Sequence, residues 1–125
     1  MQLQDGQVPI YVQIAQWLEN EIIEQRLEAD AKVFSQYQLA EKFNVNPATA
    51  GKGLTILLEK ELLYKKRGLG MFVMEGAREK LMDERVQHGL HGKVAELVEE
   101  AQRLNISERQ LIALIERIFR KGDLR

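Results

Sequence analysis

The amino-acid sequence predicts a mostly α-helical protein with one small β-hairpin, divided into a first domain over residues 1–75 and a helical tail over residues 76–125. Three patterns lead to this fold. Apolar residues recur every three or four positions in three segments before residue 60, as they do in amphipathic helices. Two short β-type runs then flank a turn that contains glycine. Helical spacing returns after residue 76 and continues almost to the end.

The first predicted helix starts at Pro9, which suits the N1 position because proline lacks an N–H that the first turn would leave unpaired. The apolar residues that follow it repeat at helical spacing to about Leu27, where the helix is expected to end. A short extended segment over residues 32–34 comes next.

Two more helices follow at the spacing of a helix-turn-helix motif. A capping box that begins at Ser35 opens a helix over about 36–43. Asn46 is a favourable N-cap and Pro47 a favourable N1 residue, so they open a third helix over about 47–60. The short turn between the two helices is the feature that predicts the motif.

The third helix has two distinct faces when its residues are placed at 100° intervals. The inner face consists of Ala50, Leu54, Leu57 and Leu58. The outer face consists of Ala48, Lys52, Thr55 and Glu59, with Thr49 beside them. Because the start of this outer face is small and lightly charged, it can approach the major groove of B-DNA closely, with Asn46, Ala48, Thr49 and Lys52 as contacts. The alternative is that small residues merely tolerate exposure here.

The hairpin carries a run of cations. Residues 62–66 and 71–74 are predicted strands around a glycine-containing turn. The cations at its tip are Lys65, Lys66 and Arg67, with no acid among them. A β-wing after a helix-turn-helix lies beside the duplex, where such a tip contacts phosphates or the minor groove. A charged run can also be an ordinary solvated turn, but its position after the motif favours DNA binding.

Charge is segregated along the chain, although 18 Lys and Arg against 19 Asp and Glu leave a formal net charge of −1. Residues 1–34 hold two basic and six acidic side chains, a sum of −4. Residues 35–73 hold six basic and three acidic side chains, a sum of +3. A nearly neutral chain can therefore present a cationic surface to a polyanion, because electrostatic attraction acts over about a Debye length.

The composition excludes other classes of protein. Of the 125 residues 45% are hydrophobic, which is enough for a packed core and argues against disorder. The absence of cysteine excludes disulfides, cysteine-bound metals and thiol catalysis. No apolar run approaches the roughly 18 residues that a membrane span needs, and residues 1–9 do not resemble a signal peptide. We therefore expect a cytoplasmic protein that does not associate with membranes.

Three segments are similar to the winged-helix domain of GntR-type bacterial transcription regulators, over roughly residues 8–74. These segments are Pro9–Ile14, Leu39–Leu54 and Arg67–Val73. The two-helix tail and the turn Asn46-Pro47-Ala48-Thr49 resemble the YtrA-like subgroup. That resemblance implies homodimeric repressors that often control their own operon and operons for ABC transporters. Family DNA contacts carry over to Tyr37, Asn46, Ala48, Thr49, Lys52 and Gly68.

The chain departs from the family pattern at two positions where an arginine is usual. Tyr37 replaces one arginine early in the second helix, and Gly51 replaces another within the third. If each arginine neutralised one phosphate, the salt dependence of DNA binding would be shallower by about 0.9 for each. The missing arginines leave an alternative open, a winged-helix adaptor that binds protein and has lost DNA binding. The retained cations, Lys52 and the wing tip, favour the DNA-binding regulator.

The tail is predicted to form a helical hairpin that pairs with a second copy. A helix over about 76–104 is expected to bend or break at Gly89 and Gly92, and a capping box at Ser107 opens the last helix. The expected dimer contacts are Leu90, Val94, Leu97, Ala101, Leu104, Leu111, Ile115, Ile118 and Phe119. A two-fold dimer would place two recognition helices on an inverted repeat. The alternative is that this stripe packs on its own winged domain.

No pattern indicates an enzyme, a cofactor or a metal. His88 and His91 are three residues apart, with Glu84 one turn earlier, but this set lacks a third strong ligand. Ser35 and Ser107 occupy cap positions, which argues against nucleophilic roles. The partners expected are double-stranded DNA, a second copy of the chain and an unidentified small-molecule effector. Such an effector would bind at the dimer interface or between the tail and the wing.

Overall fold

The computed structural model describes residues 6–122, so the outer ends of the two expected domains, residues 1–5 and 123–125, lie outside the described residues. The chain divides into two compact units, Met1–Asp83 and Glu84–Arg125. The helices of the first unit are α1 (Ile10–Ile23), α2 (Gln36–Phe43), α3 (Pro47–Glu59) and α4 (Ala77–Glu84), with strands β1 (Leu63–Lys66) and β2 (Gly70–Val73) before α4. The second unit contains η1 (Arg85–Leu90), α5 (His91–Arg103) and α6 (Glu108–Lys121). Mostly helical secondary structure with a two-strand wing confirms the predicted fold class.

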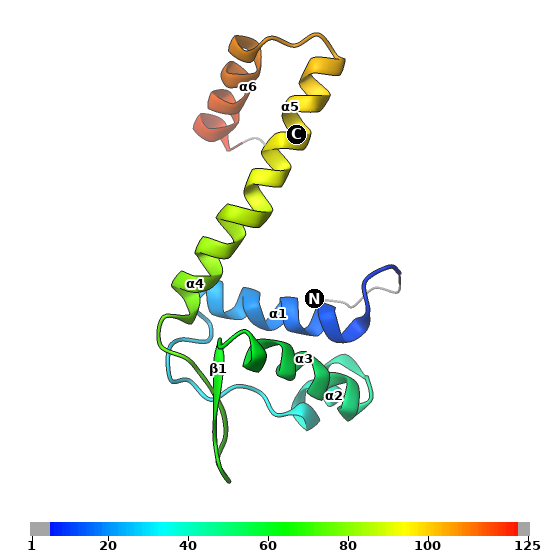
Figure 1. The fold of residues 1–125 in the computed structure, drawn as a ribbon, viewed down its shortest axis with the longest axis vertical. Helices are drawn as coiled ribbons and strands as arrows, with labels where there is room; N and C mark the ends of the chain where they lie inside the picture. Colours follow the sequence, from blue (N-terminus) through cyan, green and yellow to red (C-terminus); the bar gives the residue numbers. More distant parts are fainter. Residues whose placement is uncertain (1–5, 123–125) are drawn as a thin grey trace. The chain divides into compact units, whose positions relative to one another are not determined.

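The core of the first unit lies where α1 and α2 pack on α3, as Figure 1 shows for these three helices. Its largest buried side chains are Ile14, Leu18, Ile22, Leu39, Leu57, Leu62, Leu63, Val73 and Leu81. Ala77 and Leu81 of α4 belong to this core, so the first unit continues to Asp83 rather than ending at residue 75. Two side chains of α4 also hold it in place: Arg78 Nε donates to the Ile23 carbonyl at 2.8 Å, and Lys80 Nζ donates to the Lys60 carbonyl at 2.6 Å.

Helix α1 is shorter than the sequence predicts. Pro9 is the N-cap rather than the first helical residue, with an extended ψ of 149°. The helix ends at Ile23 instead of Leu27, because Gln25 adopts a left-handed φ of 64°. The backbone amides of Arg26 and Leu27 both donate to the Glu21 carbonyl, at 2.9 and 3.0 Å. This turn folds the chain back and brings the Leu27 side chain into the core, where helical continuation would not have placed it.

The helix-turn-helix motif forms as predicted, with its caps. The Ser35 side chain accepts from the Gln38 amide and the Gln38 side chain accepts from the Ser35 amide, which completes the capping box. Helix α2 ends at Asn44, whose φ of 54° is left-handed. The Asn46 side chain caps α3, and Pro47 is its first residue. Local capping chemistry therefore sets the turn that joins the two helices.

The wing is a short antiparallel hairpin with a third segment beside it. Leu63 pairs with Val73 and Lys66 with Gly70, which leaves a three-residue turn over 67–69. The extended segment before α2 hydrogen-bonds along β2: the Val33 amide donates to the Met71 carbonyl at 2.9 Å, and the Val73 amide donates to the Ala31 carbonyl at 3.0 Å. The strand that precedes the motif is thus attached to the wing.

The second unit is a helical hairpin of α5 and α6. Gly89 lies in η1, a π-helical stretch, and Gly92 lies in the α-helix α5, which follows η1 without a loop. The expected break is therefore a widening of the helix at Gly89, and the helix is regular at Gly92. Ser107 and Gln110 form the predicted capping box of α6. Ala101 is buried, but no residue of α6 is buried over its described length of Glu108–Lys121. This unit has little core of its own.

Within residues 6–122, none of the helices has the length and apolar character that crossing a membrane requires.

Candidate nucleic-acid interface

Helix α3 presents the two faces that its periodicity predicts. Ala50, Leu54 and Leu57 are buried, and Leu58 is half-buried. Ala48, Lys52, Thr55 and Glu59 are exposed, and Thr49 is half-buried. The Thr55 hydroxyl donates to the Gly51 carbonyl at 3.0 Å, so its proton is used within the helix. The exposed face at the start of α3 is therefore small, and Lys52 is its single charge.

Two of the predicted contacts at the start of α3 are restrained by interactions within the protein. Asn46 Oδ1 accepts from the Ala48 amide at 2.8 Å, which leaves the side-chain NH2 as the group that can donate to a ligand. The Lys52 ammonium lies 5.8 Å from the centroid of the Tyr11 ring, within range of a cation–π contact. Tyr11 belongs to α1, so the position of Lys52 depends on the packing of α1 against α3.

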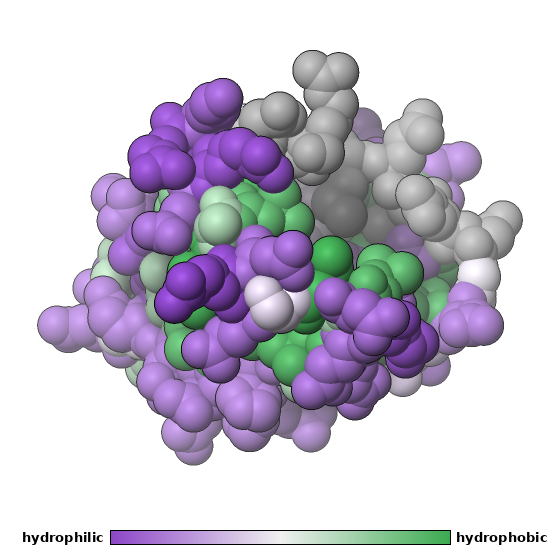
Figure 2. Space-filling model, turned by 90° about the horizontal axis from the view of Figure 1, so that it is seen from above, coloured by the Kyte–Doolittle hydropathy of each residue, from purple (hydrophilic) through white to green (hydrophobic). Residues whose placement is uncertain are grey.

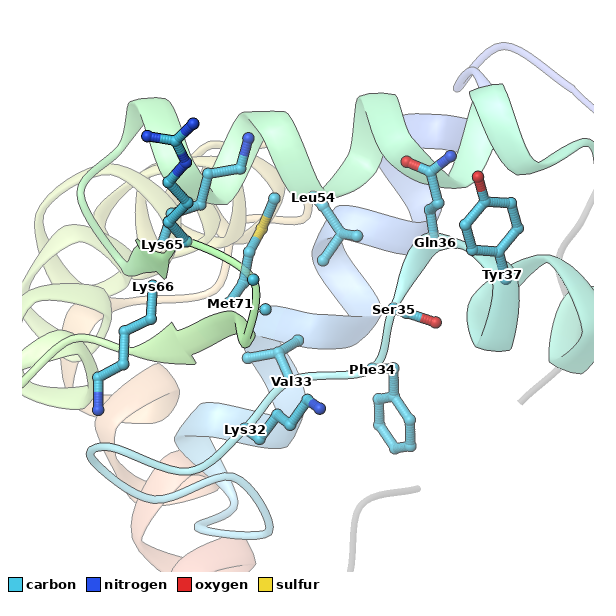
Figure 3. Close-up of a pocket in the computed structure, with 13 residues that line it drawn as sticks. Lys32, Val33, Phe34, Ser35, Gln36, Tyr37, Leu54, Lys65, Lys66 and Met71 are labelled. Atoms are coloured by element: carbon cyan, nitrogen blue, oxygen red, sulfur yellow. The ribbon is translucent and has the colours of Figure 1, made fainter.

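The three cations of the wing do not form a single tip. Lys65 and Lys66 are the last residues of β1, and only Arg67 is in the turn, followed by Gly68 at a φ of 78°. Figure 3 shows the Lys65 side chain directed toward α3 and the Lys66 side chain directed away from it. This divergence follows from the alternation of side chains along a strand. The cations thus cover both sides of the wing rather than its end alone.

Stacked aromatic rings cover the outer side of the wing. The rings of Tyr64 and Phe72 lie 5.8 Å apart in a stacked arrangement, and the Lys66 ammonium lies 4.7 Å from the Phe72 centroid. The Tyr64 hydroxyl donates to Asp30 Oδ1 at 2.6 Å. These contacts connect β1 to the segment before α2, so they fix the wing against the rest of the unit.

The Tyr64–Asp30 hydrogen bond gives a prediction for pH titration. Donation to the carboxylate favours the neutral phenol and raises the pKa of Tyr64 above its ordinary value of 10.0. Asp30→Ala should lower this pKa toward that value, as measured by phenolate absorbance in a protein whose Tyr11 and Tyr37 are replaced by Phe. The bond stabilises the fold at lower pH, and this contribution is lost as the pH rises through the raised pKa.

Glu28→Ala is the control for that titration, because Glu28 is exposed and shares the loop before the wing. It should leave the pKa of Tyr64 unchanged. Titration of Tyr64 at the same pH with and without Asp30 would contradict the assigned hydrogen bond.

A groove of about 640 Å³ lies between the wing and the start of α2 (Figure 3). Its lining residues are Lys32–Tyr37, Leu54, Lys65–Gly68, Gly70 and Met71. Four of these are cations and none is an acid. The apolar side chains in the lining are Val33, Phe34, Leu54 and Met71, of which Phe34 and Met71 are half-buried and the other two are buried. The groove can accept an anion that also has carbon surface to bury.

The groove unites some of the predicted site residues and omits others. Tyr37, with 67% of its surface exposed, lines it together with the wing cations and Gly68. Asn46, Ala48, Thr49 and Lys52 do not line it and belong to the start of α3. Lys32 lines the groove and was not among the predicted contacts. The sequence showed the charge of Lys32 and the extended segment that contains it. It did not show that this segment pairs with β2.

His88 and His91 are both exposed. Among residues 6–122, no cluster of three or more potential metal ligands is found.

A helix-turn-helix with a small exposed face on its second helix, followed by a cationic hairpin, defines a winged helix-turn-helix DNA-binding domain. The chain belongs to the family described as bacterial regulatory proteins, gntR family, which it matches over residues 10–73. It is therefore a DNA-binding transcription regulator and not an enzyme.

Individual relatives agree with this assignment. The chain is 32% identical over 75 residues to the HTH-type transcriptional repressor NagR of Bacillus subtilis, a match that covers 60% of this chain and 31% of the repressor. The chain thus spans about a third of the length of that relative. A GntR family transcriptional regulator from Listeria monocytogenes is similar in structure, with a TM-score of 0.75, 28% identity and coverage of 91% of this chain and 98% of that one.

A third similar structure is a DNA complex. It is the AraR DNA-binding domain bound to the operator ORX1, with a TM-score of 0.55 and 27% identity. The match covers 58% of this chain and 94% of that domain.

Proposed function

We propose that the protein is a YtrA-like homodimeric repressor that binds an inverted repeat in the cytoplasm and controls its own operon together with an ABC transporter. The observation that carries DNA recognition is the juxtaposition, within one compact unit, of the small exposed face of α3 and a groove with four cations. The small face suits close approach to base edges, and the cations suit phosphates. The short turn Asn46–Thr49 and the similarity to NagR support the repressor role.

The proposed DNA contacts fall into two groups. Asn46, Ala48, Thr49 and Lys52 at the start of α3 contact bases and nearby phosphates. Tyr37, Lys65, Lys66, Arg67 and Gly68 contact the backbone from the wing and from α2. Gly68 lies at a left-handed φ with no atom within 4 Å of a would-be side chain, so its role is to shape the turn.

The tail is proposed as the dimerisation element because it exposes the apolar residues that a partner would cover. Leu90, Val94, Leu97, Leu104, Ile115 and Phe119 are all exposed, and 83% of the Phe119 surface is open. Figure 2, a view from above, shows green apolar surface between the purple polar side chains. An amphipathic helix gains most of its stability by burying its apolar face, which α6 does not achieve alone.

Three predicted tail contacts differ from the rest. Ala101 is buried, and Leu111 and Ile118 are half-buried, so they contribute more to the hairpin itself than to a partner surface. An effector that binds at the dimer interface stays a prediction.

The test of DNA binding uses the wing. Lys65→Ala with Lys66→Ala should weaken binding about equally for a selected operator and a random duplex, because phosphate contacts carry no sequence information. The salt slope of the binding constant should fall by about 1 for each lysine in each bound copy. The operator is obtained by selection from a random DNA pool, which also reports whether the site is an inverted repeat.

The control is Lys93→Ala with Lys121→Ala, which removes the same charge from the tail and should leave the salt slope unchanged. Absence of any duplex binding by the wild type at low salt would favour the adaptor alternative, which the missing arginines at Tyr37 and Gly51 support. An unchanged slope in the wing variant would remove the wing from the interface.

A further inference from the structure

We propose that the groove between the wing and α2 is a second phosphate site, in which Lys32 contacts the DNA backbone beside the strand that α3 reads. The proposal rests on the DNA-binding function proposed above and adds a residue that lies outside the helix-turn-helix and the hairpin. The ligand class is the phosphodiester backbone of duplex DNA.

The backbone around Lys32 is fixed by its neighbours. Lys32 forms an antiparallel bridge to Phe72 of β2. On one side of it, the Asp30 amide donates to the Val73 carbonyl at 2.8 Å, and on the other the Val33 amide donates to the Met71 carbonyl at 2.9 Å. Val33 is buried in the core, with 4% of its surface exposed. Lys32 therefore extends from a hydrogen-bonded strand at the edge of the wing and not from a loose loop.

The side chain of Lys32 lies against Gly70, where the lack of a side chain leaves room for it. A Cβ on Gly70 would lie 3.2 Å from Lys32 Cε and 4.0 Å from Lys32 Nζ. Gly70 also has a φ of 117°, which L-residues rarely adopt, and it is the strand partner of Lys66. The end of the Lys32 side chain thus lies against Gly70, at the base of the turn.

Over the described residues, the charges of the groove are not balanced by acidic side chains. Lys32, Lys65, Lys66 and Arg67 line it without an acid, and none of the four has an ion pair among residues 6–122. The nearest acid in sequence, Asp30, accepts the hydroxyl proton of Tyr64 and does not line the groove. Gathering like charges costs free energy that a bound anion recovers. The complementary ligand is therefore an anion with several charges.

The surroundings favour a nucleic-acid strand over an isolated phosphate. The groove extends from Lys32 along the wing to Tyr37 in the first turn of α2, so a ligand in it also reaches the helix-turn-helix. The half-buried side chains of Phe34 and Met71 provide apolar surface for sugar carbons, which inorganic phosphate lacks. A DNA backbone that passes through the groove can place its phosphates against the cations and its sugars against the apolar side chains.

The experiment compares Lys32→Gln, Lys32→Arg and Lys42→Gln in the full chain bound to the selected operator. Lys42 is the matched control, because it is exposed in the same unit and lies over the Trp17 ring, 5.3 Å from its centroid, outside the groove. Lys32→Gln should lower the salt slope by about 1 for each bound copy, whereas Lys32→Arg and Lys42→Gln should preserve it. Ethylation interference should reveal one phosphate per half-site whose modification weakens the wild type but not Lys32→Gln.

The failures of the two proposals are distinguishable. If the wing double variant lowers the salt slope and Lys32→Gln does not, the DNA-binding function stands and the second phosphate site is wrong. Equal losses from Lys32→Gln and Lys42→Gln would reflect total charge alone and would also overturn it. Wild-type protein that binds no duplex would overturn the function itself. Unchanged thermal unfolding of Lys32→Gln is expected because its side chain is exposed.

Discussion

Replacing Ile115 and Phe119 by glutamate is expected to convert the proposed dimer into a monomer and to weaken binding to an inverted repeat by about 100-fold or more, because linked half-site binding is lost. Both side chains are exposed in the chain, with 37% and 83% of their surfaces open. They lie four residues apart on α6, on one face of the helix. Phe119 offers most of its surface to a partner, and Ile115 adds the third of its surface that its own hairpin leaves open. Glutamate remains a good helix former, so the helix itself is retained.

Sedimentation velocity at micromolar concentration measures the first effect, and binding to the selected operator and to one half-site measures the second. Ala113→Glu with Arg117→Gln is the control, because it changes the charge of α6 by the same amount on its polar side. The control should remain dimeric, and both proteins should bind the half-site equally. A wild type that sediments as a monomer would contradict the dimer and favour coverage of the stripe by the chain's own winged domain.

Gly53→Ala is expected to destabilise the first unit by about 1–2 kcal/mol, although alanine is the better helix former by about 1 kcal/mol. A Cβ at this position would lie 3.0 Å from the backbone carbonyl oxygen of Tyr11 and 3.0 Å from Ile14 Cγ2. Ile14 is fully buried and the carbonyl belongs to α1, so neither neighbour can yield without moving that helix. Of the two glycines in α3, Gly53 is thus the one that lies directly against α1.

Gly51→Ala is a matched control two residues away in the same helix. Its Cβ would lie 3.0 Å from Gln36 Oε1, the far end of a flexible side chain that can rotate away. We therefore expect Gly51→Ala to stabilise the protein by up to about 1 kcal/mol through helix propensity. Thermal or urea unfolding measures both changes. Equal stability of the two variants would show that α1 moves away from the added methyl group at little cost, and it would contradict the prediction for Gly53.

Local signals predicted those parts of the site that local chemistry controls. The inner and outer faces of α3 follow from its apolar periodicity, and its first residue follows from the Asn46 cap with Pro47. The capping boxes at Ser35 and Ser107 were both confirmed. In each case the deciding residues lie within one or two helical turns of each other, so no knowledge of distant partners was needed.

Periodicity failed where distant residues decide the conformation. Helix α1 was predicted to reach Leu27, but left-handed Gln25 ends it earlier and lets Leu27 enter the core. The wing cations were predicted to act as one tip, but Lys65 and Lys66 at the end of β1 are directed to opposite sides of the wing. Lys32 was absent from the predicted site because its role depends on pairing with β2, some 40 residues later in the chain.

The sequence by itself determined the order of helices and wing, the faces of α3, the caps and the family resemblance, since each depends on residue types at short, fixed spacing. Only the tertiary structure decided where α1 ends, which cations share a groove and how closely α1 approaches α3 at Gly53. These features depend on backbone pairing and side-chain packing between segments far apart in the chain. Residue spacing along one segment cannot encode such contacts, because their free energy arises only once the segments meet.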